Sequence, residues 1–92
     1  MQKTMGNGGS ILKNKFDKII DDIHEEYCSA CKIHPVWPED IIHAVAIMAE
    51  ESGESTRAAL NYVYEEQPLN ELKKELVQTA AMCVRVLINI KE

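Results

Sequence analysis

Residues 41–54 read IIHAVAIMAEESGE, and the fold of this chain is decided by this stretch. An apolar run typical of a helix core leads directly into three acids, Glu50, Glu51 and Glu54. Like charges one helical turn apart destabilise a helix by a few tenths of a kcal/mol per pair. The acids therefore require either full solvation or a neutralising partner, and the sequence on both sides of them indicates which.

A long helix is predicted around this stretch, from Pro38 to about Tyr64. Proline suits the first helical position, and Glu39 and Asp40 after it suit the positive N-terminal end of a helix. Gly53 lies inside the predicted helix and costs about 1 kcal/mol relative to alanine. We expect a neighbouring helix to approach closely at this glycine.

Two further helices are predicted, separated from the first by the segments HPVWP (34–38) and EEQPLN (65–70). One runs from about Ile11 to Lys32 with Ser10 as its N-cap, and the other from about Leu69 to Ile90. Apolar residues recur at three-to-four spacing in both, as in amphipathic helices. In the N-terminal helix they are Leu12, Phe16, Ile19, Ile20, Ile23, Tyr27, Ala30 and Cys31, and in the C-terminal one the expected core is Leu72, Leu76, Ala80, Cys83 and Leu87.

No segment alternates as a strand, so the fold class is all-α, with three main helices. We expect a flexible Gly/Asn/Ser-rich segment at residues 1–10 and a single domain at residues 11–92. A chain of 92 residues buries only about 60–70% of its unfolded surface, which favours assembly with further copies.

The composition of the chain indicates which partners and which cellular compartment to expect. The net charge of −5 argues against a nucleic-acid polymer as the main partner. No apolar run is long enough to span a membrane, and the N-terminus has no apolar signal segment. Three cysteines, an odd number, do not make a disulfide framework, so a reducing cytoplasmic location is expected.

Polar residues form a narrow stripe on each of the last two helices. At 100° per residue, five residues of the middle helix stack along one side: His43, Glu50, Glu54, Arg57 and Asn61, with Glu51 at the edge. The last helix carries a similar stripe of Glu71, Glu75, Gln78, Met82, Arg85 and Asn89. The short connection predicts antiparallel neighbours, with Glu51 and Glu54 facing Glu75 and Gln78.

Two interpretations of these stripes remain open. A polar stripe is usually the solvent face of a helix, which would make the protein a non-catalytic interaction module. Alternatively, carboxylates grouped on facing helices are relieved of repulsion by raised pKa values or by a divalent cation. Oxygen-only ligands favour Mg²⁺, with Mn²⁺ as a substitute, over Zn²⁺.

The acidic motifs resemble those of the all-α nucleoside triphosphate pyrophosphohydrolases, the MazG-like family. Glu50-Glu51-x-x-Glu54 is followed about twenty residues later by Glu75-Leu-Val-Gln78, which is similar to the family pattern E-E-x-x-E and E-x-x-D. The resemblance covers about residues 36–87. It implies cleavage of a nucleoside or deoxynucleoside triphosphate to monophosphate and pyrophosphate, by homodimers or homotetramers built around four-helix bundles.

The resemblance also implies roles for the acids. Glu51, Glu54 and Glu75 would bind Mg²⁺, and Glu50 would be a further ligand or would orient or deprotonate the attacking water. Gln78 stands where the family pattern has Asp. An amide oxygen can coordinate Mg²⁺ without contributing charge, so a nucleotide sensor that binds but does not hydrolyse stays an alternative.

Five residues around the acids are predicted to contact the substrate. Arg57, Lys74 and Arg85 are candidates for the phosphates, since guanidinium groups suit bidentate contacts. Trp37 could stack on a base or anchor its loop, and Asn61 could contact sugar or base or cap a helix end.

A separate cluster, His24, Cys28, Cys31 and His34, offers zinc or redox chemistry as an alternative. The two cysteines lie near the C-terminal end of their predicted helix, where the helix dipole disfavours a thiolate. There is no second cysteine pair, and His34 would have to fold back from its loop. Packing of the two cysteines as small apolar residues is the simpler interpretation.

Overall fold

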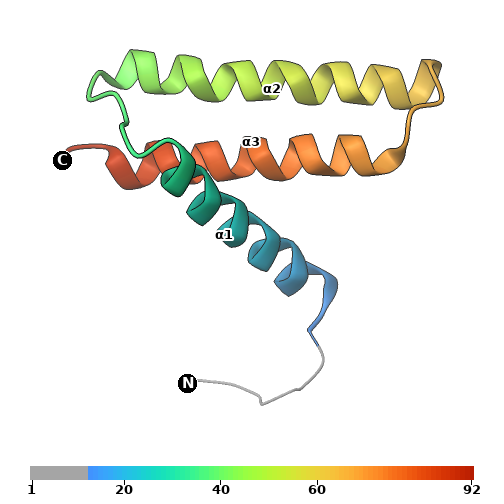
Figure 1. Cartoon of the computed structure of the whole chain (residues 1–92), viewed down its shortest axis with the longest axis horizontal. Coiled ribbons are helices and arrows are strands. Elements are labelled where there is room, and N and C mark those ends of the chain that lie inside the picture. The colour runs from blue at the N-terminus through green and yellow to red at the C-terminus, as the bar shows by residue number, and fades with distance from the viewer. Residues whose placement is uncertain (1–12) are drawn as a thin grey trace.

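Residues 13–92 are described by the computed structural model, and they form three α-helices: α1 (Lys15–Ile33), α2 (Ile41–Tyr64) and α3 (Leu69–Asn89). These residues contain no strand, which confirms the predicted all-α class. Figure 1 shows α2 and α3 side by side and antiparallel, with α1 crossing α3 at an angle. In the described part of the chain, no helix has the length and apolar character needed to cross a bilayer.

Side chains that cap the helices explain where α1 and α2 begin. The Asn14 side chain accepts a hydrogen bond from the backbone N–H of Asp17 (2.8 Å), so α1 starts later than the predicted Ile11. The predicted cap Ser10 and the predicted flexible segment 1–10 lie outside the described residues. Asp40 caps α2 by accepting from the N–H of Ile42 (3.0 Å).

The prediction that Pro38 occupies the first turn of the middle helix is therefore wrong. Pro38 lies in the connection between α1 and α2, and the Asp40 carboxylate supplies the acceptor that the helix end needs. The helix ends on either side of the connection between α2 and α3 agree better with the prediction. α2 ends at Tyr64 as predicted, and α3 runs from Leu69, as predicted, to Asn89, one residue short of the expected Ile90.

A tight connection of four residues joins α2 to α3. The backbone carbonyl of Asn61 accepts from the N–H groups of both Glu65 (2.9 Å) and Gln67 (3.1 Å), which closes the end of α2. Glu66 adopts a left-handed backbone conformation with φ of 56°. This turn reverses the chain and brings the acids of α2 opposite those of α3.

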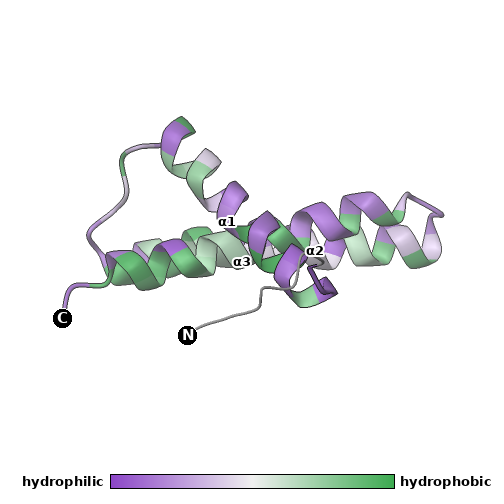
Figure 2. Cartoon of the chain, turned by 90° about the horizontal axis from the view of Figure 1, so that it is seen from below, coloured by the Kyte–Doolittle hydropathy of each residue, from purple (hydrophilic) through white to green (hydrophobic). Residues whose placement is uncertain are grey.

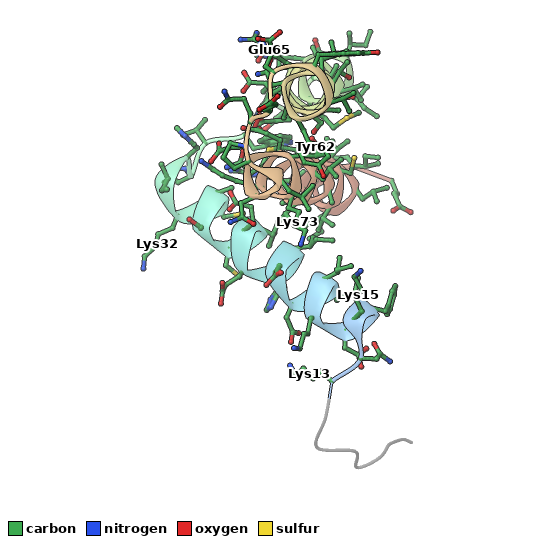
Figure 3. All side chains as sticks on the ribbon, turned by 90° about the vertical axis from the view of Figure 1, so that its right-hand side faces the viewer. Lys13, Lys15, Lys32, Tyr62, Glu65 and Lys73 are labelled. Carbon is green, nitrogen blue, oxygen red and sulfur yellow. The ribbon has the colours of Figure 1, made fainter. Side chains whose placement is uncertain are left out.

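The middle layer of the molecule is α3, which packs against α2 on one side and α1 on another. Viewed along the hairpin, α2 and α3 are stacked and α1 slants beneath α3 (Figure 3). The buried apolar residues of the described chain are small apart from one methionine. They are Ala30, Ala44, Ala81 and Met82.

The predicted core of α3 is only partly confirmed, because Leu72, Ala80 and Cys83 are half-buried but the most buried side of the helix is a different one. Met82 and Arg85, which the sequence placed on a polar stripe, are buried, whereas the expected core residues Leu76 and Leu87 are 52% and 68% exposed. α1 also differs from prediction, because Phe16, Ile19 and Ile20 are exposed and only Ala30 is buried. In α3 the difference arises because its polar stripe turns toward α1 and α2, which leaves Leu76 and Leu87 uncovered by the described residues.

No helix in the described part of the chain approaches Gly53 closely. A Cβ atom added to this residue would meet no atom within 4 Å. Gly53 lines a cleft to which all three helices contribute. Contact with a neighbouring helix of the same chain therefore does not explain the glycine.

Candidate metal and substrate site

A cleft of about 850 Å³ is formed by all three helices and the segment between α1 and α2. Glu26, Ala30 and Ile33 of α1 line one side, and Ile47, Glu50, Glu51, Gly53, Glu54 and Arg57 of α2 line the other. Gln78, Met82 and Arg85 of α3 lie between them, and His34, Val36, Trp37 and Pro38 complete the lining. The cleft combines an acidic part with an apolar and aromatic part, and its volume is in the range typical of small-ligand sites.

Three carboxylates meet where α2 faces α3. One oxygen from each of Glu51, Glu54 and Glu75 lies within 4.8 Å of the other two, as the predicted antiparallel pairing requires. Glu51 and Glu75 are half-buried, and Glu54 is exposed. Among the residues described, these three are the one group of His, Cys, Asp or Glu that could hold a metal ion with three or more ligands.

The Glu75 carboxylate has an unsatisfied oxygen. Its Oε1 atom is buried and has no hydrogen-bond partner among the described residues. A buried carboxylate oxygen without a partner is costly unless a proton or a cation neutralises it. The donor set is made of carboxylate oxygens alone, so the arrangement fits a hard divalent cation such as Mg²⁺.

Electrostatic strain is concentrated on Glu51. Burial raises the pKa of its carboxyl, and repulsion from Glu75, and then from Glu54, raises that pKa further. Smaller contributions to the raised pKa come from Glu26 and Glu50. A cation bound among these acids would oppose every one of these effects except burial.

Two further predicted site residues line the same cleft as Glu51 and Glu54. Glu50 is exposed on α2, and Gln78 is half-buried on α3. Arg57 lies on the same side of the cleft as Glu50 and Glu54. Of the three residues predicted to contact the phosphates, it is the one that is exposed in the cleft. These positions agree with the sequence-based placement, and their roles stay predictions.

Lys74 and Asn61 lie outside this cleft. Lys74 lines a shallow hollow between α1 and α3 that includes Asp22 and Glu25. Asn61 lines a smaller pocket of about 210 Å³ on α2 and α3, which Glu54, Arg57 and Glu75 also border. The structure therefore brings Asn61 near the acids from another side and does not bring Lys74 to them.

Arg85 and Trp37 contact each other. The guanidinium carbon of Arg85 lies 4.5 Å from the centroid of the Trp37 ring, a cation–π arrangement. Arg85 is only 3% exposed and donates to the backbone carbonyls of Ala30 (3.2 Å) and His34. These bonds satisfy carbonyls at the C-terminal end of α1 and hold the connection to α2 beside the cleft. Arg85 thus has a structural role that the sequence did not indicate.

The alternative His/Cys site is not assembled. Cys28 Sγ lies 3.6 Å from His24 Nε2 on the exposed side of α1. His34 lines the cleft instead, and no described group of three metal-ligating side chains contains either cysteine. Cys28, Cys31 and Cys83 are all free thiols.

Sequence reasoning missed three residues of the site. Glu26 extends the acidic part of the cleft from α1, and no motif marked it. Ser55 and Thr79 form hydrogen bonds between α2 and α3 next to the acids. A signal for this pair was present, since each hydroxyl lies four residues after a predicted metal ligand, Glu51 or Glu75.

Comparisons with known proteins gave no relatives: no protein-family model, no curated protein and no solved structure matches this chain. The resemblance to the MazG-like family therefore stays a prediction from the sequence.

Proposed function

We propose that this protein is a Mg²⁺-dependent nucleoside triphosphate pyrophosphohydrolase that converts a (d)NTP to (d)NMP and pyrophosphate. The observation that carries the proposal is the meeting of Glu51, Glu54 and Glu75 within 4.8 Å, beside a cleft of about 850 Å³. The buried, unpartnered Oε1 of Glu75 supports a cation at this point. Exposed acids that merely face water would not leave such an oxygen.

The residues of the site divide into three proposed roles. Glu51, Glu54 and Glu75 would hold Mg²⁺ (Mn²⁺ as a substitute), with the Gln78 amide as a neutral fourth donor. Bound Mg²⁺ neutralises phosphate charge and lowers the pKa of water. Glu50 is exposed in the cleft and free to orient or deprotonate the water that attacks the phosphate chain. The remaining charge on the phosphates would be met by Arg57.

The apolar part of the cleft offers a place for the base and sugar. Val36, Trp37, Ile47 and Met82 line it. The Trp37 ring already contacts the Arg85 guanidinium, so a base would stack on the ring face that Arg85 leaves free, or on the pair as a unit. We assign Arg85 to holding this wall rather than to the phosphates, because its guanidinium is engaged with backbone carbonyls.

A homodimer or homotetramer containing a four-helix bundle is part of the proposal. The support is a set of exposed apolar side chains on α2 and α3. Val45 and Val63 share one face of α2, and Leu69, Leu76 and Leu87 share one face of α3; these five residues, the outer face, are all at least 41% exposed. Figure 2 shows that the C-terminal half of α3 is largely hydrophobic. No large side chain in the described residues is fully buried, so a second copy would supply the missing core.

Light scattering after size exclusion tests the assembly. Leu87→Glu should convert an oligomer to monomer, because it buries a charge in the interface. Phe16→Glu on α1 is the matched control, since Phe16 is also 68% exposed and lies outside the outer face. A wild-type protein that elutes as a monomer would refute the proposed assembly.

A reducing cytoplasmic location completes the proposal. Its support is the set of free thiols at positions 28, 31 and 83, since disulfides form and persist in oxidising compartments.

Product analysis with a panel of (d)NTPs and Mg²⁺ tests the activity. We expect pyrophosphate and monophosphate rather than orthophosphate, with turnover lost in Glu54→Ala and in Glu51→Gln. Turnover that survives Glu54→Ala would refute the assigned site. Absent turnover with Mg²⁺ and nucleotide still raising the Tm would favour a sensor, which the uncharged Gln78 makes the second candidate. If neither turnover nor a rise in Tm is observed, the protein is a helical interaction module.

A further inference from the structure

A pair of hydroxyl groups joins α2 to α3 beside the acidic cluster. The Ser55 Oγ atom lies 2.8 Å from Thr79 Oγ1, and either group can be the donor. Both side chains are half-buried. Each hydroxyl lies one helical turn after a clustered glutamate, Ser55 after Glu51 and Thr79 after Glu75.

Both hydroxyls also reach the backbone carbonyls of those two glutamates. Ser55 Oγ lies 3.0 Å from the Glu75 carbonyl oxygen and 3.3 Å from that of Glu51. Thr79 Oγ1 lies 3.0 Å from the Glu51 carbonyl oxygen and 2.8 Å from that of Glu75. The two hydroxyl protons are shared among these contacts and the contact between the hydroxyls. Several of these contacts cross from one helix to the other.

The pair acts against the repulsion between the acids. The side chains of Glu51 and Glu75 carry like charges that push α2 and α3 apart, whereas hydrogen bonds to the backbone of the same two residues hold the helices together. Because these hydrogen bonds hold the backbone of Glu51 and Glu75 themselves, the carboxylates of these two residues have little freedom to move. Metal affinity depends on this kind of preorganisation, because a site that is too loose must order its ligands when the metal binds.

We propose that Ser55 and Thr79 are positioning residues, which set the separation of Glu51 and Glu75 and thereby the affinity of the site for a divalent cation. This inference rests on the proposed metal site. It concerns residues that would not touch the metal, since their hydroxyls are bonded to backbone carbonyls and to each other.

The test is a titration of the full-length protein with Mn²⁺ alone, in which free Mn²⁺ is measured by its electron paramagnetic resonance signal. Thr79→Val removes the hydroxyl and keeps the shape of the side chain, and Ser55→Ala removes the partner hydroxyl. We expect each to weaken Mn²⁺ binding by about tenfold or more, as changes around metal ligands commonly do. Thr79→Ser keeps the hydroxyl and should keep the affinity.

Thr56→Ala is the matched control on the same helix. The Thr56 hydroxyl donates to the Ser52 carbonyl of its own helix (3.3 Å) and is exposed, so its removal should leave Mn²⁺ binding unchanged. The inference is overturned if Thr79→Val and Ser55→Ala lower the Tm of the metal-free protein without weakening Mn²⁺ binding. A wild-type protein that binds no Mn²⁺ would refute the metal site itself. If Thr79→Val does not fold, the Mn²⁺ affinity of Ser55→Ala is compared with that of Thr56→Ala. Equal affinities in these two variants would overturn the inference.

Discussion

Replacing Glu51 with glutamine should stabilise the metal-free protein at neutral pH. Glutamine keeps the size of the side chain and removes the charge that burial, Glu75 and Glu54 all disfavour. The same change should greatly weaken metal binding, because it removes the charge of one of the three proposed carboxylate ligands. One substitution is thus expected to raise stability and abolish function, a combination typical of functional sites.

The separation of the carboxylates determines how much Glu51→Gln should raise the free energy of unfolding. At 4.8 Å, two unit charges repel by about 0.9 kcal/mol even at the dielectric constant of water, and salt reduces this value by roughly half. Glu51 has two such neighbours, and half-burial lowers the effective dielectric constant. We therefore expect a gain of about 1–2 kcal/mol in the free energy of unfolding, which corresponds to roughly 4–8 °C in Tm per kcal/mol for a chain of this size.

The pH dependence has a defined sign. Because the folded-state pKa of Glu51 is raised, the folded protein holds this proton more tightly than the unfolded chain does. The contribution of Glu51 to stability is fully present below its unfolded pKa and is lost as the pH rises through the folded pKa. The difference between variant and wild type should therefore be small near pH ~4 and open as the pH rises toward ~7.

Chemical denaturation of the metal-free proteins over this pH range is the assay. Glu25→Gln is the control, because it makes the same chemical change at an exposed site on α1 away from the cluster. Added Mg²⁺ at about ten times its Kd should stabilise wild type by about 1.4 kcal/mol and leave Glu51→Gln unaffected. A Glu51→Gln variant that is no more stable than Glu25→Gln at neutral pH would refute the proposed repulsion.

Three further predictions test the description of the site. Gly53→Ala should raise the free energy of unfolding by up to about 1 kcal/mol, since a Cβ there meets no atom of residues 13–92; a fall in thermal stability would instead place Gly53 against a partner subunit. Arg85→Met should cost about 2–4 kcal/mol in urea denaturation, because the His34 carbonyl and the Trp37 ring lose their partner and the Ala30 carbonyl keeps only its bond from the His34 N–H. It should also shift the fluorescence of Trp37, the sole tryptophan. Arg57→Ala should lower kcat/KM for the (d)NTP by about tenfold or more, whereas Lys74→Ala should leave it unchanged; equal losses in both would contradict the placement of Lys74 outside the cleft.

Helix positions were predicted best where the sequence carries strong local signals. The Pro68 breaker and the apolar period after it located the start of α3, and the acidic motifs located the cluster. The start of α2 was misplaced because Pro38 and Asp40 both suit a helix N-terminus, and only the hydrogen bond from the N–H of Ile42 to Asp40 distinguishes them. Local chemistry defines which residues can end a helix, and tertiary packing selects among them.

The acidic cluster was predictable because its members are close in sequence on two helices joined by a short turn. Glu51 and Glu54 lie one turn apart, and a four-residue connection makes antiparallel pairing with Glu75 the simplest arrangement. Glu26 was not predictable in this way, because its position depends on the angle at which α1 crosses α3. The segment from His34 to Asp40 does not determine that angle locally.

The sequence by itself thus determined that the chain is helical and that three glutamates meet between α2 and α3. Only the tertiary structure decided which face of α3 is inward. Periodicity shows which residues share a face, but α3 has two faces that could pack, the leucine stripe and the stripe containing Met82 and Arg85. The second is buried here, since Arg85 satisfies the carbonyls at the end of α1 and stacks on Trp37, contacts that exist only once the three helices have assembled.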